Sequence, residues 1–191
     1  MNILTQTDIK KYTSRNNQSR TRTYSIWHSM IKRCYGKNSE VKHPTYIDCS
    51  VVNEWFDFKN FAEWVTSNKS YDDDYDLDKD ILIPNNKIYS PDRCVFVPRE
   101  INCIFRASYK RGYDLPTGVH YQKRNRYKKY GASVSRLGGK KQHLGYFECP
   151  QEAHQAYVVA KEAYVKEVAN KWRGRIDERV YDALMNWRVT Q

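Results

Sequence analysis

Two stripes of apolar residues at helical spacing mark the first half of the chain. The first stripe consists of Tyr24, Trp27, Ile31 and Cys34, and Gly36 follows it as a helix-ending residue. The second stripe advances in steps of three and four and is strongly aromatic, with Trp55, Phe58, Phe61, Trp64 and Val65. We predict two helices here whose aromatic faces form a hydrophobic core.

The pattern then changes at the acidic stretch YDDDYDLDKD, residues 71–80. Its carboxylates break the helical spacing, and the run DDDYD within it, residues 72–76, is typical of a solvated loop. The apolar run ILI follows and ends at Pro84, Asn85 and Asn86, which are turn residues. We predict that residues 81–83 form one strand of a hairpin.

Residues 117–148 alternate as strands do. Ala132 and Val134 point to one side, and Gly131, Ser133 and Ser135 point to the other. Gly138 and Gly139 indicate a tight turn. Pro150 then opens a long helix with a stripe of small apolar residues, and IDERVYDALMNW forms a last short helix packed back on it. The pattern predicts an α+β chain that ends in a three-stranded antiparallel sheet packed on a long helix.

The net charge of the chain indicates what kind of partner it binds. The 191 residues carry a formal net charge of +11, which favours a polyanion because binding releases the counterions condensed on phosphates. An anionic membrane surface would also attract a chain of this charge, as would an acidic protein. The chain has no apolar run of about 18 residues, and its N-terminus lacks the apolar centre of a signal peptide. We expect a cytoplasmic protein with double-stranded DNA as its partner and no membrane.

The positive charge is concentrated on the predicted strands. Residues 118–143 contain no acid, and their basic residues are Lys123, Arg124, Arg126, Lys128, Lys129, Arg136, Lys140 and Lys141. Ordinary surfaces mix both signs of charge for solubility. Because one face of the sheet is covered by the helix, we predict that the other face enters a DNA major groove. The preceding basic linker adds Arg106, Lys110 and Arg111.

This region resembles a known family of DNA-binding domains. GVHYQKRNRYKKYGASV and KKQHLGYFECPQEAHQAYVVAK are similar to the Apetala or ethylene-response-factor type, in the divergent form found in phages and mobile endonucleases. The matching positions are Gly118-Val119, Tyr130, Ala132, Leu144-Gly145-Tyr146-Phe147, Glu152-Ala153 and Ala156-Tyr157. The resemblance implies that the open sheet face reads DNA through His120, Gln122, Arg124, Tyr130, Ser133 and Ser135. His120 and His143 read equally well as exposed strand residues.

The region before it resembles the HNH nucleases, which have a ββα-metal fold. Aligned with that family, the usual Asp-His becomes Asp78-Lys79, the Asn-Leu at the start of the helix becomes Arg93-Cys94, and the final asparagine is kept as Asn102. The activating histidine is absent, so the motif is degenerate. YSIWHSMIKRC, LDKD and YSP also resemble a subset of phage proteins, which implies a bacterial host cell as the compartment.

Asp78 and Asp80 are the candidate replacement for that histidine. Two carboxylates two residues apart on an extended segment would face the same side and offer oxygen ligands to Mg²⁺ or Mn²⁺. A bound ion activates water, so hydrolysis without a histidine base is chemically feasible. Equally, Lys79 between the two aspartates would neutralise them in a structural loop. The hypothetical catalytic set is Asp78, Asp80 and Asn102, with Asp78 and Asp80 as metal ligands.

We therefore predict four segments. They are a flexible basic arm at 1–20, a degenerate HNH-like module at 21–105, a basic linker at 106–115, and a DNA-binding domain with C-terminal helices at 116–191. The first hypothesis for function is a phage-type, homing-like, metal-dependent DNA endonuclease. The second is a catalytically inactive relative that acts by DNA occupancy, as a regulator or antagonist of another DNA-processing protein, with a protein target as a further partner. A module for an acidic protein partner explains the charge but not the sheet and helix pattern after Gly118.

Overall fold

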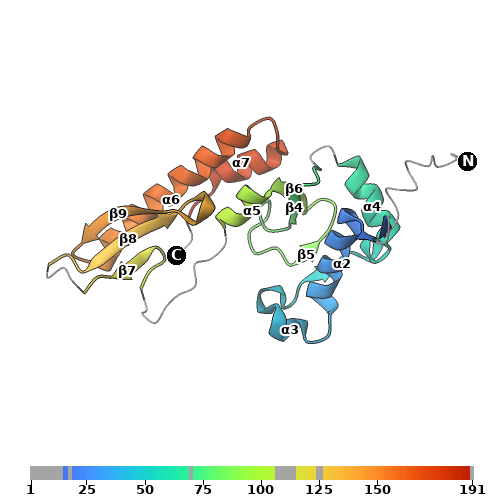
Figure 1. Cartoon of the computed structure of the whole chain (residues 1–191), viewed down its shortest axis with the longest axis horizontal. Helices are drawn as coiled ribbons and strands as arrows, with labels where there is room; N and C mark the ends of the chain where they lie inside the picture. Colours follow the sequence, from blue (N-terminus) through green and yellow to red (C-terminus); the bar gives the residue numbers. More distant parts are fainter. Residues whose placement is uncertain (1–14, 17–18, 69–70, 106–114, 124–126, 190–191) are drawn as a thin grey trace, which may run out of the picture. The chain divides into compact units, whose positions relative to one another are not determined.

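The computed structural model of the chain describes residues 15–16, 19–68, 71–105, 115–123 and 127–189 (Figure 1). The chain divides into two compact units, Met1–Val97 and Pro98–Gln191. We call them the N-terminal and C-terminal units and describe each by itself. The predicted linker at 106–115 lies almost entirely outside the described residues.

Two helices of the N-terminal unit form where the apolar stripes predict them. Helix α2 (Arg22–Tyr35) begins at Thr21, whose hydroxyl accepts from the Tyr24 amide, and α4 (Phe58–Ser67) begins at Asp57, whose carboxylate accepts from the Lys59 amide. These caps satisfy amides that have no partner inside the helix. Between the helices lie α3 (Ser39–Lys42) and the 3₁₀ turns η1 (Pro44–Tyr46) and η2 (Asn53–Phe56).

The core of this unit is aromatic where the second stripe predicts it, but α2 buries Ile26 and Met30, while the residues of the first stripe are only half-buried. Met30, Trp55 and Phe61 are buried, and the Trp55 ring lies edge-on to Phe61 with centroids 5.0 Å apart. Trp55 belongs to η2 and not to α4, but it still points into the same core. Such ring pairs add stability beyond the area that they bury.

The strands of the N-terminal unit are short. β3 (Ser50–Val51) pairs in parallel with β5 (Ile88–Tyr89), β4 (Tyr75–Asp78) pairs with β6 (Val95–Pro98), and β1 (Arg15–Asn16) pairs with β2 (Ser19–Arg20). The prediction of a strand at residues 81–83 is wrong. The strand lies upstream at β4, inside the acidic stretch, because the Asp78 carboxylate accepts hydrogen bonds from the amides of Asp80 and Ile81 and turns the chain there.

The C-terminal unit contains the predicted three-stranded antiparallel sheet. Its strands are β7 (Val119–Tyr121), β8 (Tyr130–Ser135) and β9 (Lys141–Phe147), in the order β7-β8-β9. Gly138 and Gly139 have φ angles of 75° and 74° in the turn η3 (Leu137–Gly139) between β8 and β9, as the predicted tight turn requires. The register of β8 against β9 shifts between Ala132 and Ser133.

Three helices complete this unit: α5 (Arg99–Ile104), α6 (Pro150–Trp172) and α7 (Glu178–Asn186). The first half of α6 covers one face of the sheet, where Ala132 and Val134 are fully buried, and α7 packs back on its second half (Figure 1). Gly118 permits the close approach of α6, because a Cβ there would lie 2.1 Å from the Tyr157 ring. The α+β prediction is confirmed.

Candidate nucleic-acid interface and the Asp78 loop

The face of the sheet turned away from α6 is exposed, and its residues follow from the register. Paired residues of an antiparallel sheet share a face. Gly131 pairs with His120 and Tyr146, Ser133 pairs with His143, and Ser135 pairs with Lys141. We call this set the open face: His120, Gly131, Ser133, Ser135, Lys141, His143 and Tyr146.

The centre of the open face is a cluster of rings. His120 and His143 come from the two outer strands, with ring centroids 6.5 Å apart, and the Tyr146 ring lies 4.5 Å from His143. The His120 ring lies over Gly131, where a Cβ would come within 2.4 Å of its Nε2 atom. Burial, then His143 and Lys141, lower the pKa of His120 below its usual range.

The predicted DNA contacts leave out Tyr146, and for His143 the sequence favours a DNA contact and an exposed strand residue equally. Simple alternation places 143 and 146 on opposite faces, because one number is odd and the other even. The register shift between Ala132 and Ser133 leaves one extra residue in β9, so both side chains reach the open face. A bulge of this kind has no clear signal in the sequence, although Gly145, with φ 130°, stands at it.

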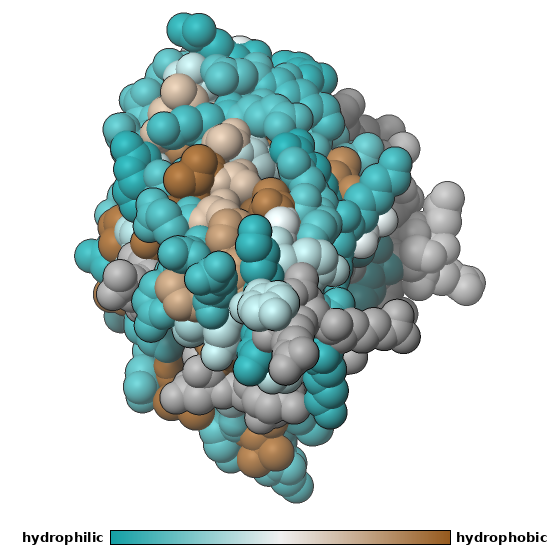
Figure 2. Space-filling view, turned by 90° about the vertical axis from the view of Figure 1, so that its left-hand side faces the viewer, coloured by the Kyte–Doolittle hydropathy of each residue, from teal (hydrophilic) through white to brown (hydrophobic). Residues whose placement is uncertain are grey.

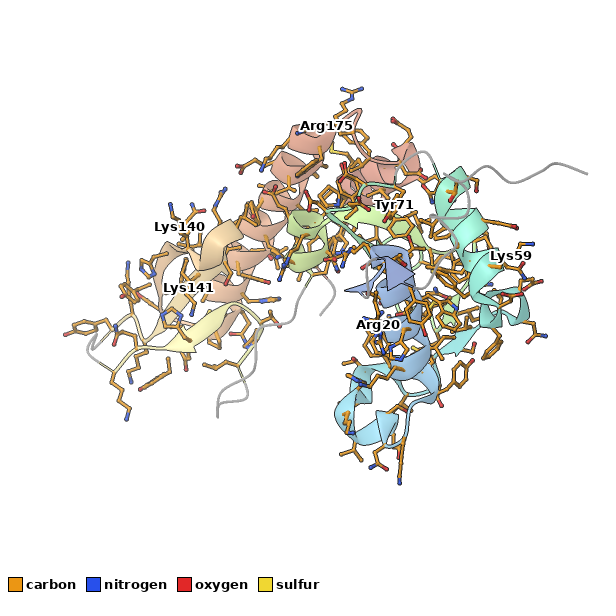
Figure 3. The ribbon with its side chains drawn as sticks, turned by 45° about the vertical axis from the view of Figure 1, so that its right-hand side comes forward. Arg20, Lys59, Tyr71, Lys140, Lys141 and Arg175 are labelled. Atoms are coloured by element: carbon orange, nitrogen blue, oxygen red, sulfur yellow. The ribbon has the colours of Figure 1, made fainter. Side chains whose placement is uncertain are left out.

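The other predicted DNA contacts surround this cluster or lie elsewhere. Lys123, Lys128, Lys140 and Lys141 are exposed, and Figure 3 labels the last two at the hairpin between β8 and β9. Gln122 continues the ladder, its amide donating to the Lys129 carbonyl at 2.7 Å. Tyr130 alternates with Ala132 and Val134, which places it on the α6 side of β8. The structure does not describe Arg106, Lys110, Arg111, Arg124 or Arg126.

Arg136 has a structural role within the same unit. Its guanidinium donates to Glu167 of α6 at 2.7 Å and to Gln142 at 2.8 Å, and it stacks over the Tyr164 ring at 4.8 Å. It therefore fastens the end of β8 to α6. The surface seen from the side of β7 to β9 is mainly hydrophilic, with scattered apolar residues (Figure 2).

The Asp78 loop, which we define as residues 78–86 of the N-terminal unit, is stabilised by hydrogen bonds of its own side chains. Asp78 ends β4, and its Oδ1 atom accepts from the Asp80 amide at 2.7 Å and from the Ile81 amide at 2.8 Å. Burial raises the pKa of Asp78 above its ordinary value, and the two amide hydrogen bonds oppose that shift. One oxygen of this carboxylate is thus used to shape the turn.

Asp80 is bound to its neighbour. The Lys79 ammonium is buried and donates to both Asp80 oxygens, at 2.7 and 2.8 Å, and to the Asn86 carbonyl at 2.6 Å. The buried Asn86 amide donates to the carbonyls of Lys79 and Ile88 and closes the loop. Lys79 and Asn86 tie the two ends of residues 79–86 together.

These contacts do not fit the hypothetical Mg²⁺ or Mn²⁺ site. A hard cation needs several oxygen ligands turned toward one point, but Asp78 faces backbone amides and both Asp80 oxygens face an ammonium. Within the described part of the chain, no group of three or more His, Cys, Asp or Glu side chains is arranged to hold a metal ion. Asn102 lies half-buried on α5, in the C-terminal unit, and has a partner of its own.

Comparison with known proteins does not assign the chain to a family, so the interpretation of the site rests on its geometry. No protein-family model, no curated protein and no solved structure matches the chain. Among the described residues, none of the helices has the length and apolar character needed to cross a membrane.

Proposed function

We propose that this chain binds double-stranded DNA on the open face of β7 to β9 and acts by occupying its site. The observation that carries the proposal is that α6 covers one face of the sheet while His120, Lys141 and His143 are exposed on the other. Three strands span about 10 Å between the outer two, at about 4.8 Å per pair. The major groove is about 12 Å wide.

The distribution of charge supports the same partner. Lysines occupy the loops at both ends of the sheet, and the net charge of the chain is +11. Lysines at the rim of such a face meet phosphates and set the orientation, while side chains at its centre meet base edges. The open face has rings and small hydroxyls at its centre and cations at its edges, which is the order that a groove requires.

Occupancy is favoured over cleavage by the Asp78 loop. Asp78 turns the backbone and Asp80 neutralises Lys79, so both carboxylates already have structural tasks. A bound protein that does not cut would act as a regulator, or as an antagonist of another DNA-processing protein, which would then be its protein partner.

A second candidate function is hydrolysis of DNA by a degenerate HNH module, in the manner of a phage homing endonuclease. The pairing of β4 with β6 favours it, because these two strands precede α5 along the chain as the strands of a ββα fold precede its helix, although β5 lies between them in sequence. Asp78 stands where β4 ends. The hypothetical catalytic residues remain Asp78, Asp80 and Asn102.

The binding proposal is tested by the salt dependence of DNA affinity. We expect the affinity of the wild type to fall steeply with salt. Lys140→Gln with Lys141→Gln should lower the slope of log K against log salt by about 0.9 for each phosphate that the variant no longer neutralises. Lys59→Gln, a change at an exposed lysine of α4, is the matched control. A flat salt response of the wild type would refute the proposal.

Cleavage is tested separately on plasmid DNA with Mg²⁺ or Mn²⁺. Asp78→Asn and Asp80→Asn keep the size of each side chain, so loss of folding is minimised. Occupancy predicts that all three proteins bind and none nicks. Nicking by the wild type alone, at equal DNA binding, would establish the second candidate instead.

A further inference from the structure

We propose that His120 and His143 contact DNA as a protonated pair, so that binding of DNA to the open face takes up protons. The inference rests on the proposed function and deepens it. It assigns the centre of the interface to two imidazoles, with acceptor atoms of the duplex as their ligands.

The geometry brings the two imidazoles together above the middle strand. His120 projects from β7 and His143 from β9, and the space between them is left by Gly131 and Ser133 of β8. Their centroids are 6.5 Å apart, and both residues are exposed. A ligand that lies across the sheet would therefore meet both rings at once.

The groups around His120 disfavour its charged form while DNA is absent. Lys141 and the Tyr146 phenol flank it on β9, and Ser133 and Ser135 face it from β8. The sequences of β7, β8 and β9 contain no carboxylate that could stabilise an imidazolium. The partial burial of the His120 ring lowers its pKa most, and electrostatic interaction with His143 and Lys141 lowers it further.

A bound duplex reverses this balance. Phosphate oxygens are anionic, and purine N7 atoms accept hydrogen bonds in the major groove. Either acceptor favours imidazolium, which donates from both ring nitrogens. Since the charged form of His120 is disfavoured in the free protein, and both imidazoles would face acceptor atoms in the complex, protons enter on binding. Each imidazole that gains a full proton raises affinity by at most about tenfold per pH unit of acidification.

The experiment measures DNA affinity of the full chain from pH 8.0 to 5.5 at constant ionic strength. Calorimetry in buffers of different ionisation enthalpy counts the protons directly. We expect the wild type to bind about tenfold or more tightly at pH 6 than at pH 7.5. His120→Gln and His143→Gln should each lose part of this dependence, and the double variant should lose nearly all of it.

His154→Gln is the matched control. His154 lies on α6, with its Nδ1 atom 2.9 Å from the Thr117 carbonyl, away from the open face. We expect it to keep the dependence of the wild type. Duplexes with 7-deazapurines lack the N7 acceptor, so a dependence that vanishes on them assigns the contact to base edges, and one that persists assigns it to phosphates.

Two outcomes would overturn the inference alone. They are DNA binding by the wild type that does not change with pH, and a double variant that takes up as many protons as the wild type. Absence of DNA binding at every pH would overturn the proposed function and, with it, this inference. The two failures are therefore distinguishable.

Discussion

Replacement of Lys79 by methionine tests whether the contacts of the Lys79 ammonium stabilise the Asp78 loop. Methionine keeps the length of the side chain beside the Tyr46 and Tyr89 rings, but it removes the ammonium that binds Asp80 and the Asn86 carbonyl. The Lys79 side chain is 7% exposed, whereas that of Asp80 is 51% exposed.

The magnitude follows from what each acceptor loses. Asp80 regains water, so its part of the pair is worth about 0–1 kcal/mol. The Asn86 carbonyl belongs to a buried residue and is left without its donor, which costs about 1–3 kcal/mol. We expect Lys79→Met to lower the free energy of unfolding by about 1–4 kcal/mol, a large share of the stability of a small domain.

Urea unfolding followed by tryptophan fluorescence measures this change. The N-terminal unit holds three of the five tryptophans, Trp27, Trp55 and Trp64. Lys59→Met on α4 is the control, since its ion pair with Glu63 is exposed and 3.9 Å long, and it should change stability by less than about 0.5 kcal/mol. If the two variants unfold alike, the ammonium of Lys79 does not hold the loop, and Asp80 has no structural task that would keep it from a cation.

Three further predictions concern Asp78, the glycines at 118 and 138, and Cys34. Burial raises the pKa of Asp78 above 3.8, so the folded state holds its proton longer than the unfolded state, and stability falls as pH rises from about 3.8 through the raised pKa. Asp78→Asn should remove that pH dependence in thermal melts and leave the turn intact, and a wild-type melting temperature that is constant over this range would contradict it. Gly118→Ala should destabilise the C-terminal unit by more than about 2 kcal/mol, because of the Tyr157 ring and a φ of 84°. At Gly138 φ is also positive, at 75°, but an added Cβ would meet no atom within 4 Å, so Gly138→Ala should lower the free energy of unfolding by only about 1 kcal/mol. If the two alanine variants lose the same stability in the unfolding assay, the Tyr157 ring does not obstruct a side chain at residue 118. Burial raises the pKa of the Cys34 thiol from 9.0 to about 11. At pH 8 Cys34 should therefore react with iodoacetamide about a hundredfold more slowly than an unshifted thiol, and peptide mass spectrometry can measure this rate. A rate equal to that of an unshifted thiol would show that burial does not suppress the thiolate.

The parts of the fold that could be predicted are those set by local periodicity. Helix α6 begins at Pro150 because proline suits a first turn, and Ala132 with Val134 faces α6 because strand side chains alternate. The strand β4 could not be predicted in this way. The backbone amides that donate to the Asp78 carboxylate, and the link between Lys79 and Asn86 across the loop, override the apolar run at residues 81–83.

The same distinction applies to the candidate site. A basic, acid-free sheet is visible in the composition, and the exposure of Lys123, Lys128, Lys140 and Lys141 agrees with it. The ring cluster is not visible there, because a single bulge in β9 decides which face His143 and Tyr146 share. Register depends on how residues of separate strands pair, so it cannot be read from a short stretch of sequence.

The anchoring of α5 on α6 bears on where this protein can be cut and transplanted. The Glu100 carboxylate, 10% exposed, accepts from Lys171 and from the Trp172 ring nitrogen, and the Lys161 ammonium donates to the Ile104 carbonyl at 2.6 Å. A recombinant fragment that starts at residue 116 would remove the acceptors of these three side chains. A fragment that keeps these contacts must therefore include α5, and a gene fusion that preserves them must join new sequence before Arg99.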